Sequence, residues 1–164
     1  MARPAQAIIN LKALRHNFQL AASLSSPGLA LAVVKANAYG HGAVPVARAL
    51  ADLAPAFGVA CIEEALELRA AGIENPILLL EGIFSADEVS VAAENDFWLM
   101  LENEQQFSAL ENASVTQALK VWLKVDTGMH RLGLSVEDLT PAYRRMQACK
   151  NVDETIVVAT HFAC

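Results

Sequence analysis

The sequence contains few cysteines and no long hydrophobic run. Its three cysteines, Cys61, Cys149 and Cys164, lie far apart and form no Cys-x-x-Cys pair. This usage argues against a disulfide framework and a metal site, and it fits a reducing cytoplasm. No apolar run approaches the roughly 20 residues that a membrane-spanning helix needs. The N-terminal residues 1–10 also lack the long apolar stretch of a signal peptide.

Basic residues are scarce as well. The chain has 12 Lys and Arg against 18 Asp and Glu, a net charge of −6. We therefore expect no nucleic-acid partner, because phosphate contacts need clustered Lys and Arg. A small anionic ligand needs only one or two local cations and stays possible. With 54% hydrophobic and 18% charged residues among 164, the composition is that of one globular domain.

Short apolar runs alternate with amphipathic segments along the chain. Several runs, such as LALAVV and ILLL, are continuously apolar, which is typical of a parallel sheet covered on both faces. We predict strands at 29–34, 56–60, 77–80, 97–101, 119–125 and 156–160. We predict helices at 44–53, 63–71, 86–94, 104–111 and 136–150. Ser85 and Ser135 are candidate N-caps, and Gly72 is a candidate C-cap.

The spacing of the strands is regular. Five strand-to-strand steps connect Leu29 to Ile156, a separation of 127 residues, or about 25 residues per step. Repeated βα units indicate a doubly wound sheet or a (β/α)8 barrel. No GxGxxG glycine pattern follows the first strand, and the short period favours the barrel. We therefore predict an α/β fold, a (β/α)8 TIM-type barrel truncated here to about six βα units.

A complete barrel of this type has eight units in about 250 residues. Six strands would leave the first and the last with unpaired edges, which favours aggregation. We therefore expect this chain to be part of a longer enzyme and not to fold cleanly alone. A sharp, cooperative unfolding transition of the isolated monomer would count against this expectation.

Four polar residues follow predicted strands, where barrel enzymes place their chemistry. Lys35 closes the first strand, Lys124 ends the fifth, Arg131 comes seven residues later and His161 follows the sixth. Each has an ordinary alternative: a solvated lysine, a surface ion-pair arginine, or a core or capping histidine. Their shared position at one rim raises the odds of a site.

The segment AVVKANAYGHG, which contains Lys35, is the most unusual of the segments that hold these four residues. Lys35 ends a buried strand, and partial burial favours a neutral amine, which can attack an aldehyde and form a Schiff base. Gly40 and Gly42 open the next helix and could present backbone N–H groups to a phosphate. Tyr39 is either a hydrogen-bond donor to that phosphate or a packing residue. The motif therefore fits an aldehyde that carries a phosphate.

The segment LKVDTGMHRLG holds two cations close together. Gly128 and Gly133 can fix the angle of Arg131, whose planar guanidinium suits a substrate carboxylate. Lys124 would lie near it, so either an anion lies between these cations or one is chemically altered. Asp126 is more typical of a turn cap than of a catalytic acid. Acidic pairs such as Glu63 and Glu64 are typical of solvated helix faces.

These segments resemble the signature motifs of bacterial alanine racemases. AVVKANAYGHG is similar to the pyridoxal-phosphate lysine motif of that family, and LKVDTGMHRLG and THFA resemble its next two motifs, in the expected order. The resemblance extends over essentially the whole chain and includes IINLKALRHN. The family usually has aspartate where this sequence has Asn10, and both residues can cap the following helix.

The resemblance implies a set of roles. Lys35 would carry pyridoxal 5'-phosphate as an internal aldimine and transfer a proton. Tyr39 would contact the cofactor phosphate, and Arg131 would bind on the substrate carboxylate side. Lys124 would be the position that is often carbamylated. His161 would join the hydrogen-bond network around the cofactor.

The resemblance also implies what lies outside this chain. The family interconverts L-alanine and D-alanine with two bases, and the second base is a tyrosine from a C-terminal β domain, donated across a homodimer interface. Residues 1–10 would be a strand of that domain, and residues 11–164 a partial barrel. The chain alone would then be inactive. Both a role in cell-wall D-alanine synthesis and a role in alanine breakdown stay open.

Three other functions remain possible at this point. The chain could be a pyridoxal-phosphate-binding barrel without racemase activity, although such a protein does not need the segment with Lys124 and Arg131. It could be a Schiff-base aldolase that uses Lys35 without a cofactor. It could also keep only the fold and weak cofactor binding.

Overall fold

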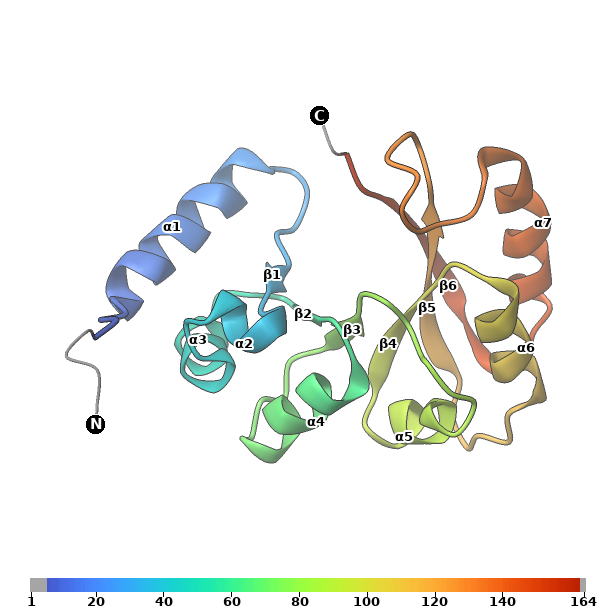
Figure 1. Ribbon diagram of the computed structural model, residues 1–164, viewed down its shortest axis with the longest axis horizontal. Coiled ribbons are helices and arrows are strands. Elements are labelled where there is room, and N and C mark those ends of the chain that lie inside the picture. Colours follow the sequence, from blue (N-terminus) through green and yellow to red (C-terminus); the bar gives the residue numbers. More distant parts are fainter. Residues whose placement is uncertain (1–5, 163–164) are drawn as a thin grey trace.

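The computed structural model describes residues 6–162, which form six strands that alternate with helices (Figure 1). None of the helices in this range is long and apolar enough to cross a membrane. The elements, in chain order, are α1 (Leu11–Leu24), β1 (Ala32–Val33), α2 (Lys35–Tyr39), α3 (Ala43–Leu50), β2 (Phe57–Val59), α4 (Ile62–Ala70), β3 (Ile77–Leu79), α5 (Glu88–Glu94), β4 (Phe97–Leu101), α6 (Glu104–Asn112), β5 (Leu119–Val125), α7 (Val136–Gln147) and β6 (Val152–Thr160).

All six strands are parallel and lie in sequential order in one sheet. A doubly wound sheet reverses its strand order at one point, whereas a barrel steps in one direction throughout. The sequential order therefore confirms the predicted barrel type. In the described part of the chain, β1 and β6 are the two edges of this partial barrel.

The hydrophobic core lies between the outer face of the sheet and the helices. Side chains alternate between the two faces of a strand, and Phe57, Ile77, Phe97, Leu99 and Leu123 are all fully buried. Figure 1 shows α3–α7 along this outer side, with α1 beyond β1. The continuous burial of β2 and β3 agrees with their purely apolar sequences.

The inner face of the sheet is covered less completely. Trp98 on β4 and Trp122 on β5 stack there with ring centroids 6.1 Å apart, and the Lys120 ammonium lies 5.3 Å from the centre of the Trp98 ring. A cavity of about 390 Å³ adjoins these rings. The inner face thus carries large side chains at its amino-terminal end.

Two predicted strands differ from the observed ones by more than one residue at an end. The first was expected over 29–34 but β1 has two residues, because only Ala32 and Val33 pair with β2 and the other edge of β1 has no neighbour. The sixth was expected over 156–160 but β6 begins at Val152, which pairs with Leu119 ahead of an irregularity in the β5 register. The lengths of these two edge strands are therefore determined more by pairing with the neighbouring strand than by their own composition.

The helix caps were mostly predicted correctly. The Asn10 side chain accepts hydrogen bonds from the N–H groups of Lys12 and Ala13, and Ser135 accepts one from Asp138. Gly72 follows α4 in the left-handed conformation, at φ 83°. The Ser85 prediction was wrong: α5 begins later, at Glu88, and the Ser85 hydroxyl instead donates to the Glu88 carboxylate.

The predicted strand over residues 1–10 stays a prediction. Residues 6–10 are not in a strand here, residues 1–5 lie outside the described residues, and the partner domain expected for that strand is not part of this chain.

Candidate active site

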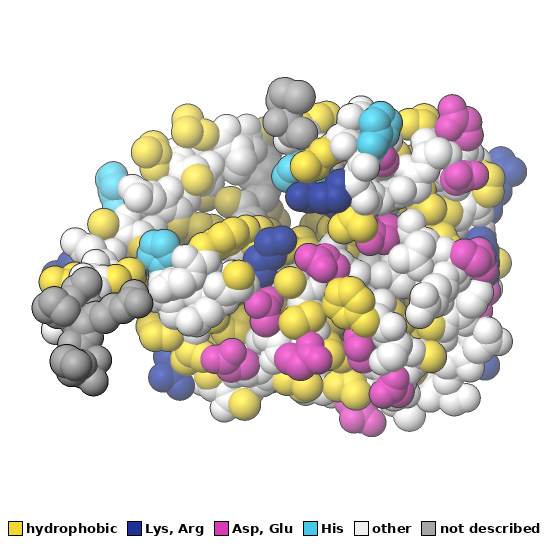
Figure 2. All heavy atoms as spheres, viewed as in Figure 1, with side chains coloured by type: hydrophobic (Ala, Val, Ile, Leu, Met, Phe, Trp, Pro, Cys, Tyr) yellow, Lys and Arg dark blue, Asp and Glu magenta, His cyan; other side chains and the backbone are white. Residues whose placement is uncertain are grey.

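A cavity of about 500 Å³ lies at the carboxyl ends of the strands. Figure 2 shows a hollow in this face with basic and histidine side chains at its edge. The five residues singled out from the sequence all line this cavity, although they come from three separate parts of the chain: Lys35, Tyr39, Lys124, Arg131 and His161. The predicted convergence at one rim is confirmed.

Lys35 enters the cavity directly after the first strand. Its side chain is about one-third exposed, and its Nζ atom lies 3.8 Å from Oε1 of Glu81. Glu81 follows β3 and also lines the cavity. The lysine amine is therefore held beside a carboxylate in a partly desolvated position.

The backbone after Lys35 is left-handed. Ala36, Asn37, Ala38 and Tyr39 have φ values of 50°, 54°, 52° and 53°. For residues with a Cβ atom this conformation costs about 1–2 kcal/mol each. Such a segment persists only where its surroundings fix it, and such segments cluster at functional sites. The sequence predicted a glycine-marked loop here, but the strained residues precede Gly40 and Gly42.

One prediction for this loop was wrong. Gly40 and Gly42 were expected to offer their N–H groups to a phosphate. Instead, the N–H of Gly40 donates to the carbonyls of Ala36 and Asn37, and that of Gly42 donates to Asn37. These two N–H groups close the left-handed turn and are not directed at a phosphate. Tyr39, which lines the cavity, is then the residue of this loop whose hydroxyl could donate a hydrogen bond to a phosphate.

The loop that carries Arg131 is closed by Asp126. Oδ1 of Asp126 accepts hydrogen bonds from the N–H groups of Gly128 and His130, both 3.0 Å long, and Oδ2 lies 3.0 Å from Nδ1 of His130. A side chain on Gly133 would approach the backbone of Asp126 to 2.7 Å. Asp126 therefore caps the turn, as the sequence indicated, and the turn holds Arg131 over the cavity.

Because of Asp126, the stability of this folded loop should depend on pH in the acid range. The two backbone N–H groups, and then the His130 ring, lower its pKa to about 2. A lowered pKa means that the carboxylate stabilises the folded loop fully above the ordinary value near 3.8, and that this contribution is lost as the pH falls towards 2. An NMR titration of the Asp126 carboxyl carbon should have its midpoint near 2. A midpoint at the ordinary aspartate value would contradict this geometry.

Lys124 has an acidic neighbour that the sequence reading missed. Glu102 follows β4, and its Oε2 atom is buried without a hydrogen-bond partner. Burial raises the pKa of Glu102, and the Glu81 carboxylate raises it further. The positive charges of Lys124 and Arg131 act in the opposite direction and lower it. The net effect is a raised pKa, with burial as the largest cause and the two cations opposing it, so Glu102 lies within electrostatic reach of Lys124 and Arg131.

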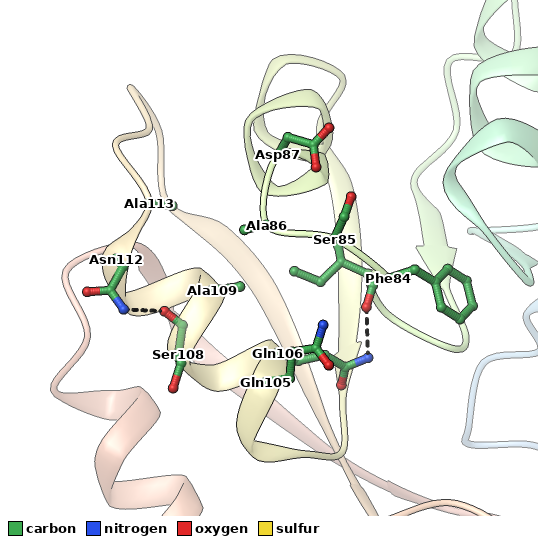
Figure 3. A pocket seen from close by; sticks show the side chains of 11 residues that line it. Phe84, Ser85, Ala86, Asp87, Gln105, Gln106, Ser108, Ala109, Asn112 and Ala113 are labelled. Carbon is green, nitrogen blue, oxygen red and sulfur yellow. Dashed lines mark hydrogen bonds between the residues drawn. The ribbon is translucent and has the colours of Figure 1, made fainter.

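Gln106 fixes the two loops that carry these glutamates. Its side-chain nitrogen donates to the carbonyls of Glu81 and Ile83, and its oxygen accepts from the N–H of Glu102. The residue is 4% exposed, and its side chain points toward the loop after β3 (Figure 3). A side chain on Gly82 would approach Gln106 to 2.5 Å, so the loop needs glycine there.

His161 stands at the end of β6, beside Thr160. The Thr160 hydroxyl donates to the carbonyl of Val125 and lies 2.8 Å from the hydroxyl of Thr127. These contacts connect the Arg131 loop to the strand end that carries His161. Two sides of the cavity are therefore fixed relative to each other.

The acidic residues of the site, Glu81 and Glu102, were not predicted from the sequence. Glu81 and Glu102 follow β3 and β4 as closely as Lys35 follows β1, so the same rule could have found them. The prediction that Glu64 belongs to a solvated helix face was wrong. Glu64 is half-buried and accepts hydrogen bonds from the N–H groups of Ala36 and Ala60.

A second cavity has fewer charged side chains in its lining. It measures about 450 Å³ and lies between the loop after β3 and helix α6 (Figure 3). Asp87 is its one charged lining residue. Across residues 6–162, no three His, Cys, Asp or Glu side chains lie together in a way that could hold a metal ion. The Lys35 cavity is the candidate active site.

Comparisons with known proteins point to one family. The family model described as "Alanine racemase, N-terminal domain" matches residues 9–164. An alanine racemase of Pseudomonas fluorescens is 56% identical over 161 residues, and a catabolic alanine racemase of Pseudomonas putida is 54% identical over 161 residues. Each match covers 98% of this chain and 44% of the relative, so the chain spans less than half of their length.

Solved structures agree with these matches. The biosynthetic alanine racemase of Pseudomonas aeruginosa superposes with a TM-score of 0.89 at 44% identity, over 94% of this chain and 43% of that protein. A histidine racemase from Leuconostoc mesenteroides subsp. sake superposes with a TM-score of 0.83 at 32% identity, over 94% and 42% of the two chains.

Proposed function

This chain belongs to the alanine racemase family, and we propose that it supplies the cofactor-anchoring part of an enzyme that interconverts L-alanine and D-alanine. The observation that carries the proposal is the Lys35 amine in a cavity that also presents Arg131 and His161. Alanine is favoured as the substrate because the relatives with the highest identity are named for it.

The donor chemistry of the cavity fits pyridoxal 5'-phosphate. That group needs a primary amine for its aldehyde, hydrogen-bond donors for its phosphate, and room for its ring. Lys35 offers the amine, Tyr39 offers a hydroxyl on the same wall, and the volume of about 500 Å³ is within the range of small-molecule sites. We propose that Lys35, Tyr39 and His161 hold the cofactor.

The proposed reaction assigns a task to each residue. When bound, pyridoxal phosphate takes up the electron pair that a substrate Cα–H bond leaves behind. Lys35 would hold or deliver the proton on one face of that carbon. Arg131 would bind the substrate carboxylate through its planar guanidinium. Lys124, if carbamylated, would become an anion beside Arg131 and remove the repulsion between the two cations.

Racemisation needs a second base on the opposite face. The sequence has two tyrosines: Tyr39 belongs to the cavity wall, and Tyr143 packs against the core from α7. We therefore propose that the second base comes from a C-terminal β domain across a homodimer interface. Residues 1–10 would join that domain, and residues 11–164 would form the barrel part. The cysteine usage favours a cytoplasmic site of action.

The anchor can be tested on this chain when it is completed by the remaining part of the Pseudomonas fluorescens relative. Pyridoxal phosphate is added, the mixture is reduced with sodium borohydride, and the modified peptide is identified by mass spectrometry. We expect a visible absorbance band that the reduction abolishes, with the cofactor mass on Lys35. A band that persists in Lys35→Ala, or modification spread over exposed lysines such as Lys12 and Lys150, would contradict the proposal.

The reaction needs a second readout. A chimera in which this chain replaces the matched segment of the Pseudomonas fluorescens relative supplies the remaining parts of that protein. We expect the chimera to racemise alanine. A chimera that folds and binds the cofactor at Lys35 without racemising alanine would instead favour a barrel that binds the cofactor only.

A further inference from the structure

Glu64 connects the candidate active site to a neighbouring loop. It is the third residue of α4, which follows β2. Its Oε1 atom accepts a 2.7 Å hydrogen bond from the N–H of Ala36, and its Oε2 atom accepts a 2.8 Å hydrogen bond from the N–H of Ala60. One carboxylate therefore joins two backbone segments that are 24 residues apart, counting from Ala36 to Ala60.

Helix capping explains only half of this arrangement. A glutamate at the third helical position commonly reaches back to an N–H group just before its own helix. That role accounts for the bond from Ala60. It does not account for the bond from Ala36, which lies in the loop after another strand, 28 residues from Glu64.

The bond from Ala36 lies where the backbone is strained. Ala36 is the residue directly after Lys35 and the first of four consecutive left-handed residues. The other bonds of this turn come from within its own loop: the Ala38 N–H donates to Val34, and the Ala43 N–H donates to the Asn37 side chain. The Glu64 carboxylate is the contact that fixes the start of the turn from outside the loop.

We propose that Glu64 is a positioning residue for Lys35, an inference that rests on the proposed function. By holding the peptide between Lys35 and Ala36, it fixes the direction in which the lysine side chain enters the cavity. The chemistry requires a carboxylate, because both partners are N–H donors. A glutamine amide has one oxygen and one NH2 group, so it would satisfy one partner and oppose the other.

Glu63 provides a matched control. It is the preceding residue on the same helical turn, it carries the same charge, and it is exposed. Glu63→Gln therefore removes an equal charge from the same surface without touching the Lys35 loop. Any effect of net charge appears in both variants. The loss of the capping bond from Ala60 and the loss of the bond from Ala36 appear in Glu64→Gln alone, and hydrogen exchange of the loop after Lys35 distinguishes these two losses.

The test compares Glu64→Gln, Glu64→Ala and Glu63→Gln with the unchanged sequence, each in the chimera. Pyridoxal phosphate is titrated, and the visible absorbance and visible circular dichroism are recorded. A bond to a charged group commonly contributes enough for about a tenfold change in an equilibrium constant. For both Glu64 variants we expect about tenfold weaker cofactor binding and reduced dichroism per bound cofactor. Glu63→Gln should match the unchanged sequence.

Two further measurements separate the possible failures. Amide hydrogen exchange of residues 36–43, measured without cofactor, should accelerate in the Glu64 variants and not in Glu63→Gln; unchanged exchange would overturn the inference. Thermal unfolding shows whether a variant has lost its fold, and Glu64→Gln is the milder change. If the unchanged sequence gives no Lys35-dependent band, the proposed function fails, and the exchange data still decide whether Glu64 holds the turn. A normal dichroism signal in Glu64→Gln would overturn the positioning role.

Discussion

The Lys35→Ala chimera should lose racemisation by at least about a thousandfold, because the substitution removes both the covalent anchor of the cofactor and a proton-transfer group. The side chain is one-third exposed, and its ammonium lies 3.8 Å from the Glu81 carboxylate, so little packing is lost. The measurement is the exchange of D-alanine and L-alanine at saturating pyridoxal phosphate. Thermal unfolding of the same sample should change little.

Lys150→Ala is the matched control for this variant. Lys150 is exposed in the turn before β6, at the end of the strands opposite to the cavity. Its removal should leave the rate unchanged. A small added amine, such as methylamine, should restore part of the rate of Lys35→Ala, because a free amine can replace the missing base. A rate for Lys35→Ala within a few-fold of the unchanged chimera would refute the assigned role.

The second large effect is expected at Arg131. Arg131→Met should lower kcat/KM for alanine by about a hundredfold, because a paired guanidinium–carboxylate contact is among the stronger polar interactions of a binding site. The side chain is exposed and its loop is closed by Asp126 and Gly133, so the loop itself should survive the change. The measurement is the steady-state rate at several alanine concentrations.

Two variants bracket this prediction. Arg131→Lys keeps the charge but loses the planar fork, so its kcat/KM should fall between those of Arg131→Met and the unchanged chimera. Arg144→Met removes an exposed arginine of α7 that does not line the cavity, and it should have no effect. An equal loss in Arg144→Met would mean that net charge, and not carboxylate binding, explains the result.

The central strands were predictable from the sequence because they are determined by their own composition. Strands 97–101 and 119–125 were predicted to the residue, as β4 and β5. Each is an apolar or alternating run with neighbours on both sides. The ends of β1 depended on pairing with β2, so the apolar residues 29–31 gave a false extension.

The basic residues of the site and Tyr39 were predictable, whereas its acidic residues were not. Lys35, Lys124, Arg131 and His161 stand out because basic residues are rare in this chain and follow apolar strands. The left-handed turn at Ala36 and Ala38 was not predictable, since alanine has no preference for that conformation and tertiary contacts impose it. Glu64 was misread for the same reason: its partner at Ala36 is remote in sequence.

The intrinsic fluorescence of the stacked tryptophan pair reports on the inner face of the sheet. Trp98 and Trp122 are the two tryptophans of the sequence, and their rings lie 6.1 Å apart, so all of the tryptophan emission arises from one place, the inner surface of β4 and β5. The wavelength of that emission reports how much water reaches this surface. A blue shift without any added label therefore signals that the inner face has been covered.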